Sequence, residues 1–105
     1  MEQPLIQIYA IFHLNLAYSS LEDYQRSEVI QQCYWPLFRL ARKHDLPFGF
    51  EASGYTLEVL SAEDSQCFQE LRWLVTEGSC EFIGSGYAQI IGPLVPAEVN
   101  RKNLV

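Results

Sequence analysis

The chain has 105 residues, of which 49% are hydrophobic and 19% are charged, and its formal net charge is -6 at pH 7. This composition predicts one globular domain of modest size and argues against a disordered chain. The acidic balance argues against nucleic-acid or anionic-membrane binding, because both need clustered Lys and Arg side chains.

Neither a signal peptide nor a membrane span is expected. The N-terminal residues MEQPL carry no positive charge, and the longest apolar run is much shorter than the ~20 residues that cross a bilayer. Cys33, Cys67 and Cys80 are widely spaced, each lies inside an apolar pattern, and no CxxC pair occurs. We therefore expect three reduced core cysteines in a cytoplasmic protein.

The first predicted element is a strand over Leu5–Leu16, rich in Ile, Tyr and Phe. It is apolar on both faces, which favours a parallel strand covered by helices on one side and by core on the other. Tyr9, Ile11, His13 and Asn15 share one parity and should point to one face. The strand therefore delivers two polar groups, His13 and Asn15, to its carboxyl end.

Helical spacing begins at Ser27, the expected N-cap, and should end near His44, before Pro47. Pro36 should kink this helix or start a second segment. The apolar positions at helical spacing are Val29, Ile30, Cys33, Tyr34, Leu37, Leu40 and Ala41.

A second strand is predicted over Phe48–Ala52, followed by a short helical segment over Tyr55–Leu60. Ser61 and Asp64 then offer caps for a further helix, and Gly78 is a suitable residue to end it. The expected buried side of that helix carries Cys67, Phe68, Leu71, Leu74 and Val75.

A third strand is predicted over Cys80–Ile83, followed by a tight Gly-Ser-Gly loop and a helix that opens at Pro96. Strands that alternate with helices predict an α/β fold with a parallel βαβαβ segment. The last helix has nothing beyond it to pack against. We therefore expect residues 1–105 to be a single partial domain, the beginning of a larger α/β protein.

Ligands of parallel α/β folds bind at the carboxyl ends of the strands, so polar residues there are the candidate site. His13 could bind a hydroxyl or stabilise charge, but it could equally be a core histidine satisfied by backbone groups. Glu81 could be a site carboxylate or half of a structural ion pair, and Glu51 could point under a helix or into a cleft. The candidates are His13, Asn15, Glu51, Ser53, Glu81, Ser85 and Tyr87.

The sequence contains no convincing metal site, phosphate loop or GxSxG elbow, so no metal or cofactor is expected. Exposed tyrosines near a polar rim, namely Tyr18, Tyr55 and Tyr87, suit stacking on sugar rings, although tyrosine is equally common as filler.

Three blocks occur in a distinctive order and spacing: FHLN at residues 12–15, YWPLFRLARKHDLPFGFEASGYTLEVL at 34–60, and GSCEFIGSGYAQIIGPLVPAEV at 78–99. Together they resemble the N-terminal part of glycoside hydrolase family 57 over nearly the whole chain. The resemblance implies an incomplete seven-stranded (β/α) barrel, of which this chain is the opening three βα units. It also implies action on α-glucan or a related polysaccharide, by retaining hydrolysis or glycosyl transfer, without a required metal.

The resemblance carries over to few residues. His13 matches the histidine of the family's first motif and Glu81 the glutamate of its second, and both imply substrate contacts. Two positions depart from the family pattern. Asn15 stands where many members have proline, and Gln89 stands where many members have histidine. The family's nucleophile and acid/base lie on later strands, so no catalytic residue is expected in this chain, which should be inactive alone.

Two readings follow. In the first, this chain is part of a carbohydrate-active enzyme and supplies substrate-binding residues only, namely His13, Asn15, Glu51, Glu81 and Tyr87. In the second, it is a stand-alone small α/β binding or assembly module, which self-associates through the open sheet edge at its third strand.

Overall fold

The computed structural model describes residues 5–17, 21–90 and 92–104. Its centre is a parallel sheet of three strands in the order β1-β2-β3, formed by β1 (Ile11–Leu14), β2 (Gly49–Ala52) and β3 (Glu81–Gly84). The register pairs His13 with Glu51 and Glu51 with Ile83. The predicted α/β fold with parallel strands that alternate with helices is therefore confirmed.

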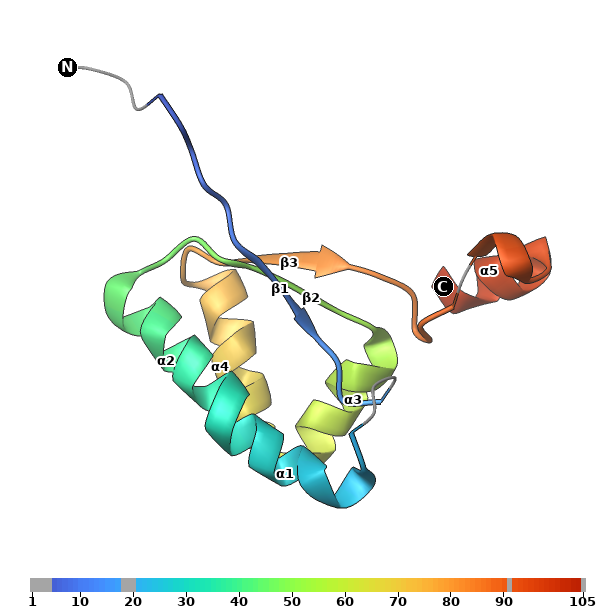
Figure 1. Ribbon diagram of the computed structural model, residues 1–105, viewed down its shortest axis with the longest axis horizontal. Helices are drawn as coiled ribbons and strands as arrows, with labels where there is room; N and C mark the ends of the chain where they lie inside the picture. The colour runs from blue at the N-terminus through green and yellow to red at the C-terminus, as the bar shows by residue number, and fades with distance from the viewer. Residues whose placement is uncertain (1–4, 18–20, 91, 105) are drawn as a thin grey trace.

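The helices between the strands lie on one side of this sheet (Figure 1). The last helix, α5, projects beyond the carboxyl end of β3 instead of covering the sheet (Figure 1). The helical elements are η1 (Asp23–Gln25), α1 (Arg26–Val29), the π-helical η2 (Ile30–Tyr34), α2 (Trp35–His44), α3 (Gly54–Glu63), α4 (Ser65–Thr76), η3 (Gly92–Leu94) and α5 (Ala97–Leu104).

The core lies between the sheet and these helices and is built on aromatic rings. Phe50 of β2 is 0% exposed and meets Phe38 of α2 edge to face, with ring centroids 5.2 Å apart. Phe12 and Phe48 pack against the same cluster. Since side chains alternate across a strand, Phe12 and Phe50 leave His13 and Glu51 on the opposite side.

That opposite side, which we call the open face, carries Ile11, His13, Gly49, Glu51, Glu81 and Ile83. The sequence predicts a first strand that is covered by helices on one side and by core on the other. For the described residues the second half of this prediction is wrong, because Ile11 on the open face is 56% exposed. The predicted length of that strand, Leu5–Leu16, is also wrong. Only Ile11–Leu14 pairs with β2, because β2 itself has four residues, and the described chain before it extends past the sheet (Figure 1).

The helix expected from Ser27 begins earlier and changes phase in the middle. A capping box of Glu22 and Gln25 starts the helical run, so Ser27 lies inside α1 and is not the N-cap. The π turn η2 ends at Tyr34, two residues before Pro36, whose nitrogen carries no hydrogen to donate. The wider turn brings Ile30, Tyr34 and Phe38 into the core.

This change of phase corrects two predicted core positions. Cys33 and Leu40 are exposed, although the helical spacing places both on the buried side. All three cysteines are free thiols, and only Cys67 and Cys80 are buried as expected. Burial raises the pKa of Cys67 to about 12, so that thiol is protonated and acts as core filler.

The predicted cap of the helix after Ser61 is confirmed at Asp64. One carboxylate oxygen accepts from the Cys67 backbone N–H at 3.0 Å, and the other accepts from the Trp35 indole N–H at 2.7 Å. Gly78 follows this helix, α4, and donates its N–H to the Trp73 carbonyl at 3.0 Å. Asp64 thus both caps α4 and ties it to α2.

We predict that Asp64→Ala lowers the free energy of unfolding by about 1–2 kcal/mol, because it removes an N-cap and the partner of Trp35. Urea denaturation followed by circular dichroism measures the loss. Glu63→Ala, next to it and exposed, is the matched control and should cost little. Equal losses in the two variants would contradict the role of the cap.

No helix in the described part of the chain is both long enough and apolar enough to cross a membrane. The cytoplasmic location expected from the cysteines stays a prediction.

Candidate functional site

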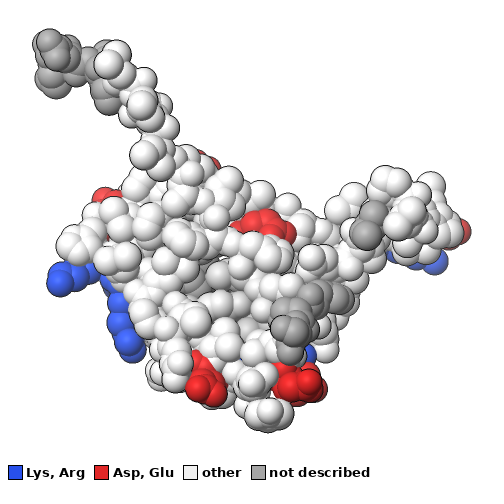
Figure 2. All heavy atoms as spheres, in the orientation of Figure 1, with Lys and Arg blue, Asp and Glu red and all other residues white. Residues whose placement is uncertain are grey.

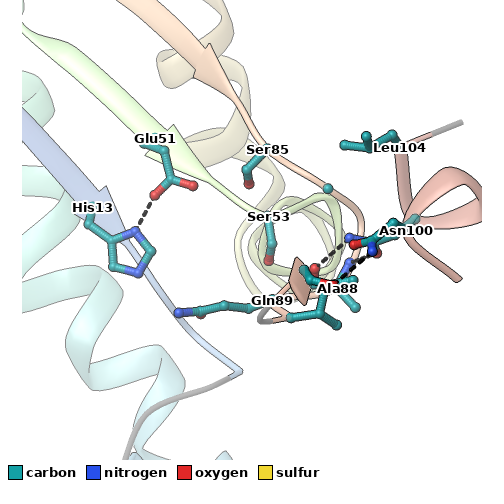
Figure 3. Close-up of a pocket in the computed structure, with 12 residues that line it drawn as sticks. His13, Glu51, Ser53, Ser85, Ala88, Gln89, Asn100 and Leu104 are labelled. Atoms are coloured by element: carbon teal, nitrogen blue, oxygen red, sulfur yellow. Dashed lines mark hydrogen bonds and ion pairs between the residues drawn. The ribbon is translucent and has the colours of Figure 1, made fainter. Parts of the chain in front are cut away.

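A pocket of about 430 Å³ opens where the carboxyl ends of the three strands meet the loop after β3 and α5 (Figure 3). His13 of β1 and Glu51 of β2 line it directly, and Ser85 is the residue that follows β3, so the ends of all three strands meet at this rim. The lining residues are His13, Glu51, Ser53, Ser85, Gly86, Ala88, Gln89, Ile90, Gly92, Asn100, Asn103 and Leu104.

His13 and Glu51 form the polar pair at the sheet side of this pocket. They are register partners on β1 and β2, and their side chains point toward one another on the open face (Figure 3). His13 Nδ1 contacts Glu51 Oε2, and the two side chains are 51% and 24% exposed. Because a carboxylate only accepts, Nδ1 carries the proton, and Nε2 is left to accept from a ligand or, when protonated, to donate.

Two serines join the strand ends to the next elements. Ser53 caps α3: its Oγ accepts from the Thr56 backbone N–H and donates to Thr56 Oγ1, both at 3.2 Å. Ser85 donates its hydroxyl to the Ala52 carbonyl at 3.0 Å, across from β3 to β2. Both serines therefore have a structural partner, and both also line the pocket.

Asn15 lies next to the pocket through its contact with a lining residue. Its side-chain amide donates to Gln89 Oε1 at 3.3 Å, and its backbone N–H donates to the Tyr34 hydroxyl oxygen at 3.0 Å. Burial raises the pKa of Tyr34 to about 12, so this phenol stays neutral and holds the end of β1 in place. Asn15 and Gln89 thus connect the first strand with the loop after the third.

The far wall of the pocket comes from α5, which sequence reasoning did not assign to the site. The Asn103 side chain pairs with both backbone groups of Ala88, accepting from its N–H at 2.6 Å and donating to its carbonyl at 2.9 Å. Asn100 donates to the Gly92 carbonyl at 2.9 Å. One feature of the sequence could have pointed to them: Asn100 and Asn103 are three residues apart, so their side chains share one face of the predicted helix.

Glu81 lies on the open face but not at the carboxyl rim. It is the first residue of β3 and pairs with Gly49, the first residue of β2. The prediction that Glu81 lies at the carboxyl rim is therefore wrong, because the paired strand Glu81–Gly84 continues for three residues after it. Glu81 does not line the pocket, and its Oε2 accepts from the Tyr9 hydroxyl at 3.1 Å.

Tyr87 also turns away from the pocket. Its hydroxyl donates to Glu58 Oε2 at 2.8 Å, and its ring packs against Tyr55 on α3, with ring centroids 6.0 Å apart. The structure thus brings His13, Glu51, Ser53 and Ser85 together and leaves Tyr87 at the outer side of α3.

The chemistry of the pocket suits a neutral ligand with many hydroxyl groups. Glu51 is the only carboxylate among its described lining residues, beside an imidazole, two hydroxyls and three amides. No Lys or Arg side chain is among the described residues that line the pocket, so anion binding there is disfavoured. In Figure 2, the Lys and Arg side chains on the visible face lie along its edges. Within the described ranges, no cluster of three or more His, Cys, Asp or Glu side chains is placed to hold a metal ion.

Comparison with known proteins gives a family match. The model of the family described as Glycosyl hydrolase family 57 matches residues 3–104. The chain is also similar to Alpha-amylase 1 of Dictyoglomus thermophilum, with 28% identity over 75 residues, which cover 70% of this chain and 11% of that relative. The chain therefore spans about a tenth of the length of the curated relative it matches. No solved structure matches it significantly.

Proposed function

The chain belongs to glycosyl hydrolase family 57, and from this premise we propose that it forms part of the wall of a carbohydrate-binding cleft. The ligand proposed is an α-glucan or a related polysaccharide. The name of the Dictyoglomus thermophilum relative, an alpha-amylase, supports that choice of linkage. The reaction class proposed for the complete protein is retaining hydrolysis or glycosyl transfer.

One observation carries this proposal: side chains from all three strand ends, His13, Glu51 and Ser85, line one pocket together with amide side chains. A sugar hydroxyl is both a donor and an acceptor. Glu51 accepts, the free Nε2 of His13 accepts or donates, and Asn100 and Gln89 can do both. A neutral polyhydroxylated ligand satisfies such a mixed set better than an anion or an apolar molecule does.

The barrel remains part of the proposal. Three parallel strands in sequential order, with their interstrand helices on one face and polar residues on the open face, are what the opening part of an incomplete seven-stranded (β/α) barrel requires. In that architecture the open face becomes the inner wall. His13, Glu51 and Glu81 would then face the enclosed space.

Bond cleavage is assigned to groups outside this chain. Retaining glycoside hydrolysis uses two carboxyl groups roughly 5–5.5 Å apart. Glu51 is the only carboxylate among the described lining residues, and His13 already engages it. The proposal therefore gives this chain ligand contacts and no catalytic residue.

A titration of the isotope-labelled chain with a maltooligosaccharide tests the proposal. Amide signals of Ser53, Ser85 and Gln89 should move at millimolar ligand, while those of Gln66 and Gln69, on the outer side of α4, should not. A β-linked cello-oligosaccharide is the control for linkage. Unmoved pocket signals would overturn the proposal, and a concentration-dependent rise in mass by light scattering would then favour the assembly module.

A further inference from the structure

Tyr9 reaches across one strand of the sheet to contact another. It lies on the segment before β1, and its hydroxyl donates to Glu81 Oε2 on β3 at 3.1 Å. Strand β2 lies between the two, since the sheet order is β1-β2-β3. The crossing side chain therefore has to pass over β2, and the residue beneath it is Gly49, the register partner of both Ile11 and Glu81.

Gly49 leaves the space that this crossing uses. A Cβ atom built on Gly49 would lie 2.6 Å from Tyr9 Oη and 3.1 Å from Tyr9 Cζ, both too close for an undisturbed ring. No described glycine has a positive φ, so backbone conformation does not require glycine at this position. The absent side chain is what allows the Tyr9–Glu81 contact.

We propose that Tyr9 is a positioning residue that holds the Glu81 carboxylate on the open face, over the gap left by Gly49. One carboxylate oxygen is occupied by the phenol, which leaves the other for a hydroxyl of the ligand. The ligand part rests on the proposed carbohydrate function, whereas the positioning itself does not.

The arrangement gives each carboxylate of the open face its own donor. His13 contacts Glu51, and Tyr9 contacts Glu81. The residue beside Glu51 on β3 is Ile83, and Glu81 lies two residues before it. Without Tyr9, the exposed Glu81 side chain would sample several rotamers, and ordering it on a ligand would cost conformational entropy. A held carboxylate avoids that cost at the moment of binding.

The ionisation of Tyr9 provides a direct readout of the contact. The pKa of the Tyr9 phenol is raised above its usual value. The largest cause is partial burial against the sheet, followed by the hydrogen bond to Glu81 and by the negative charges of Glu81 and of Cys80. Because the Glu81 charge disfavours the phenolate, its removal should lower that pKa. Displacement of Tyr9 from Glu81 should do the same.

The first experiment measures the pKa of Tyr9 in the chain labelled with ¹³Cζ-tyrosine, the signal being assigned by its loss in Tyr9→Phe. Glu81→Gln and Gly49→Ala should each lower the pKa. Gly84→Ala is the matched control, because a Cβ there meets nothing within 4 Å. An unchanged pKa in both Glu81→Gln and Gly49→Ala overturns the proposal.

The second experiment measures maltooligosaccharide affinity. Tyr9→Phe should weaken binding about fivefold, the effect of one hydrogen bond, and should add nothing when Glu81→Gln is already present. Tyr24→Phe, at a tyrosine 82% exposed on η1, is the control and should leave the affinity unchanged. Full additivity of Tyr9→Phe and Glu81→Gln contradicts positioning. A lowered pKa without any sugar binding keeps the positioning and rejects the proposed function instead.

Discussion

Phe50→Ala should lower the free energy of unfolding by about 3–5 kcal/mol, which is a large share of the roughly 5–15 kcal/mol that stabilises a typical domain. Phe50 is 0% exposed and packs between the sheet and the helices. Its ring centroid lies 5.2 Å from that of Phe38 on α2 and 6.1 Å from that of Phe12 on β1. Truncation leaves a cavity beneath β2, the central strand. Urea denaturation followed by circular dichroism measures the change.

Ile11→Ala is the matched control for this prediction. Ile11 is an apolar strand residue on the neighbouring β1, but it lies on the open face and is 56% exposed. Its truncation removes little buried surface and should cost less than about 1 kcal/mol. If both variants lost the same stability, the helix side of the sheet would not be the principal core.

His13→Ala should weaken maltooligosaccharide binding by about tenfold or more, which corresponds to the loss of hydrogen bonds to a group that can carry charge. It removes the imidazole that the proposed function assigns to a sugar hydroxyl, and it also leaves the Glu51 carboxylate without its donor. The His13 side chain is 51% exposed, so the unfolding free energy should change little. Calorimetric titration with the sugar, beside thermal unfolding, separates the two effects.

His44→Ala is the corresponding control, because His44 is the chain's other histidine and lies exposed at the end of α2. It should alter neither the affinity nor the melting temperature. The opposite pattern, in which His13→Ala lowers the melting temperature and leaves sugar affinity intact, would make His13 a structural residue of the sheet.

Local patterns were sufficient for the order of the three strands and the longer helices. The Asp64 cap, the end of α2 at His44 and the helix opening at Pro96 depend on neighbours in the sequence, and each lies where it was predicted. The errors in the predicted core positions lie in and after the π turn, where the α-helical spacing of 3.6 residues is interrupted. After the π turn Ile30–Tyr34, Phe38 lies in the core and Leu40 is 46% exposed, although the helical spacing assigns Leu40, and not Phe38, to the buried side.

The candidate site was only partly accessible to sequence reasoning. That His13, Glu51 and Ser53 come to one rim follows from parallel strands ending at the same edge. Asn100 and Asn103 were missed because the position of α5 depends on the contact of Asn103 with the Ala88 backbone, which no local pattern encodes.

The sequence by itself determined the α/β class, the polar ends of the first two strands and the family resemblance, because these depend on residue types and spacing along the chain. Only the tertiary structure decided that Glu81 lies at the start of its strand and not at the carboxyl rim, that Tyr87 turns toward Glu58, and that Tyr9 crosses Gly49 to reach Glu81. The physical reason is register. A shift of one residue between strands moves every side chain to the other face, and the packing of the aromatic core sets that register.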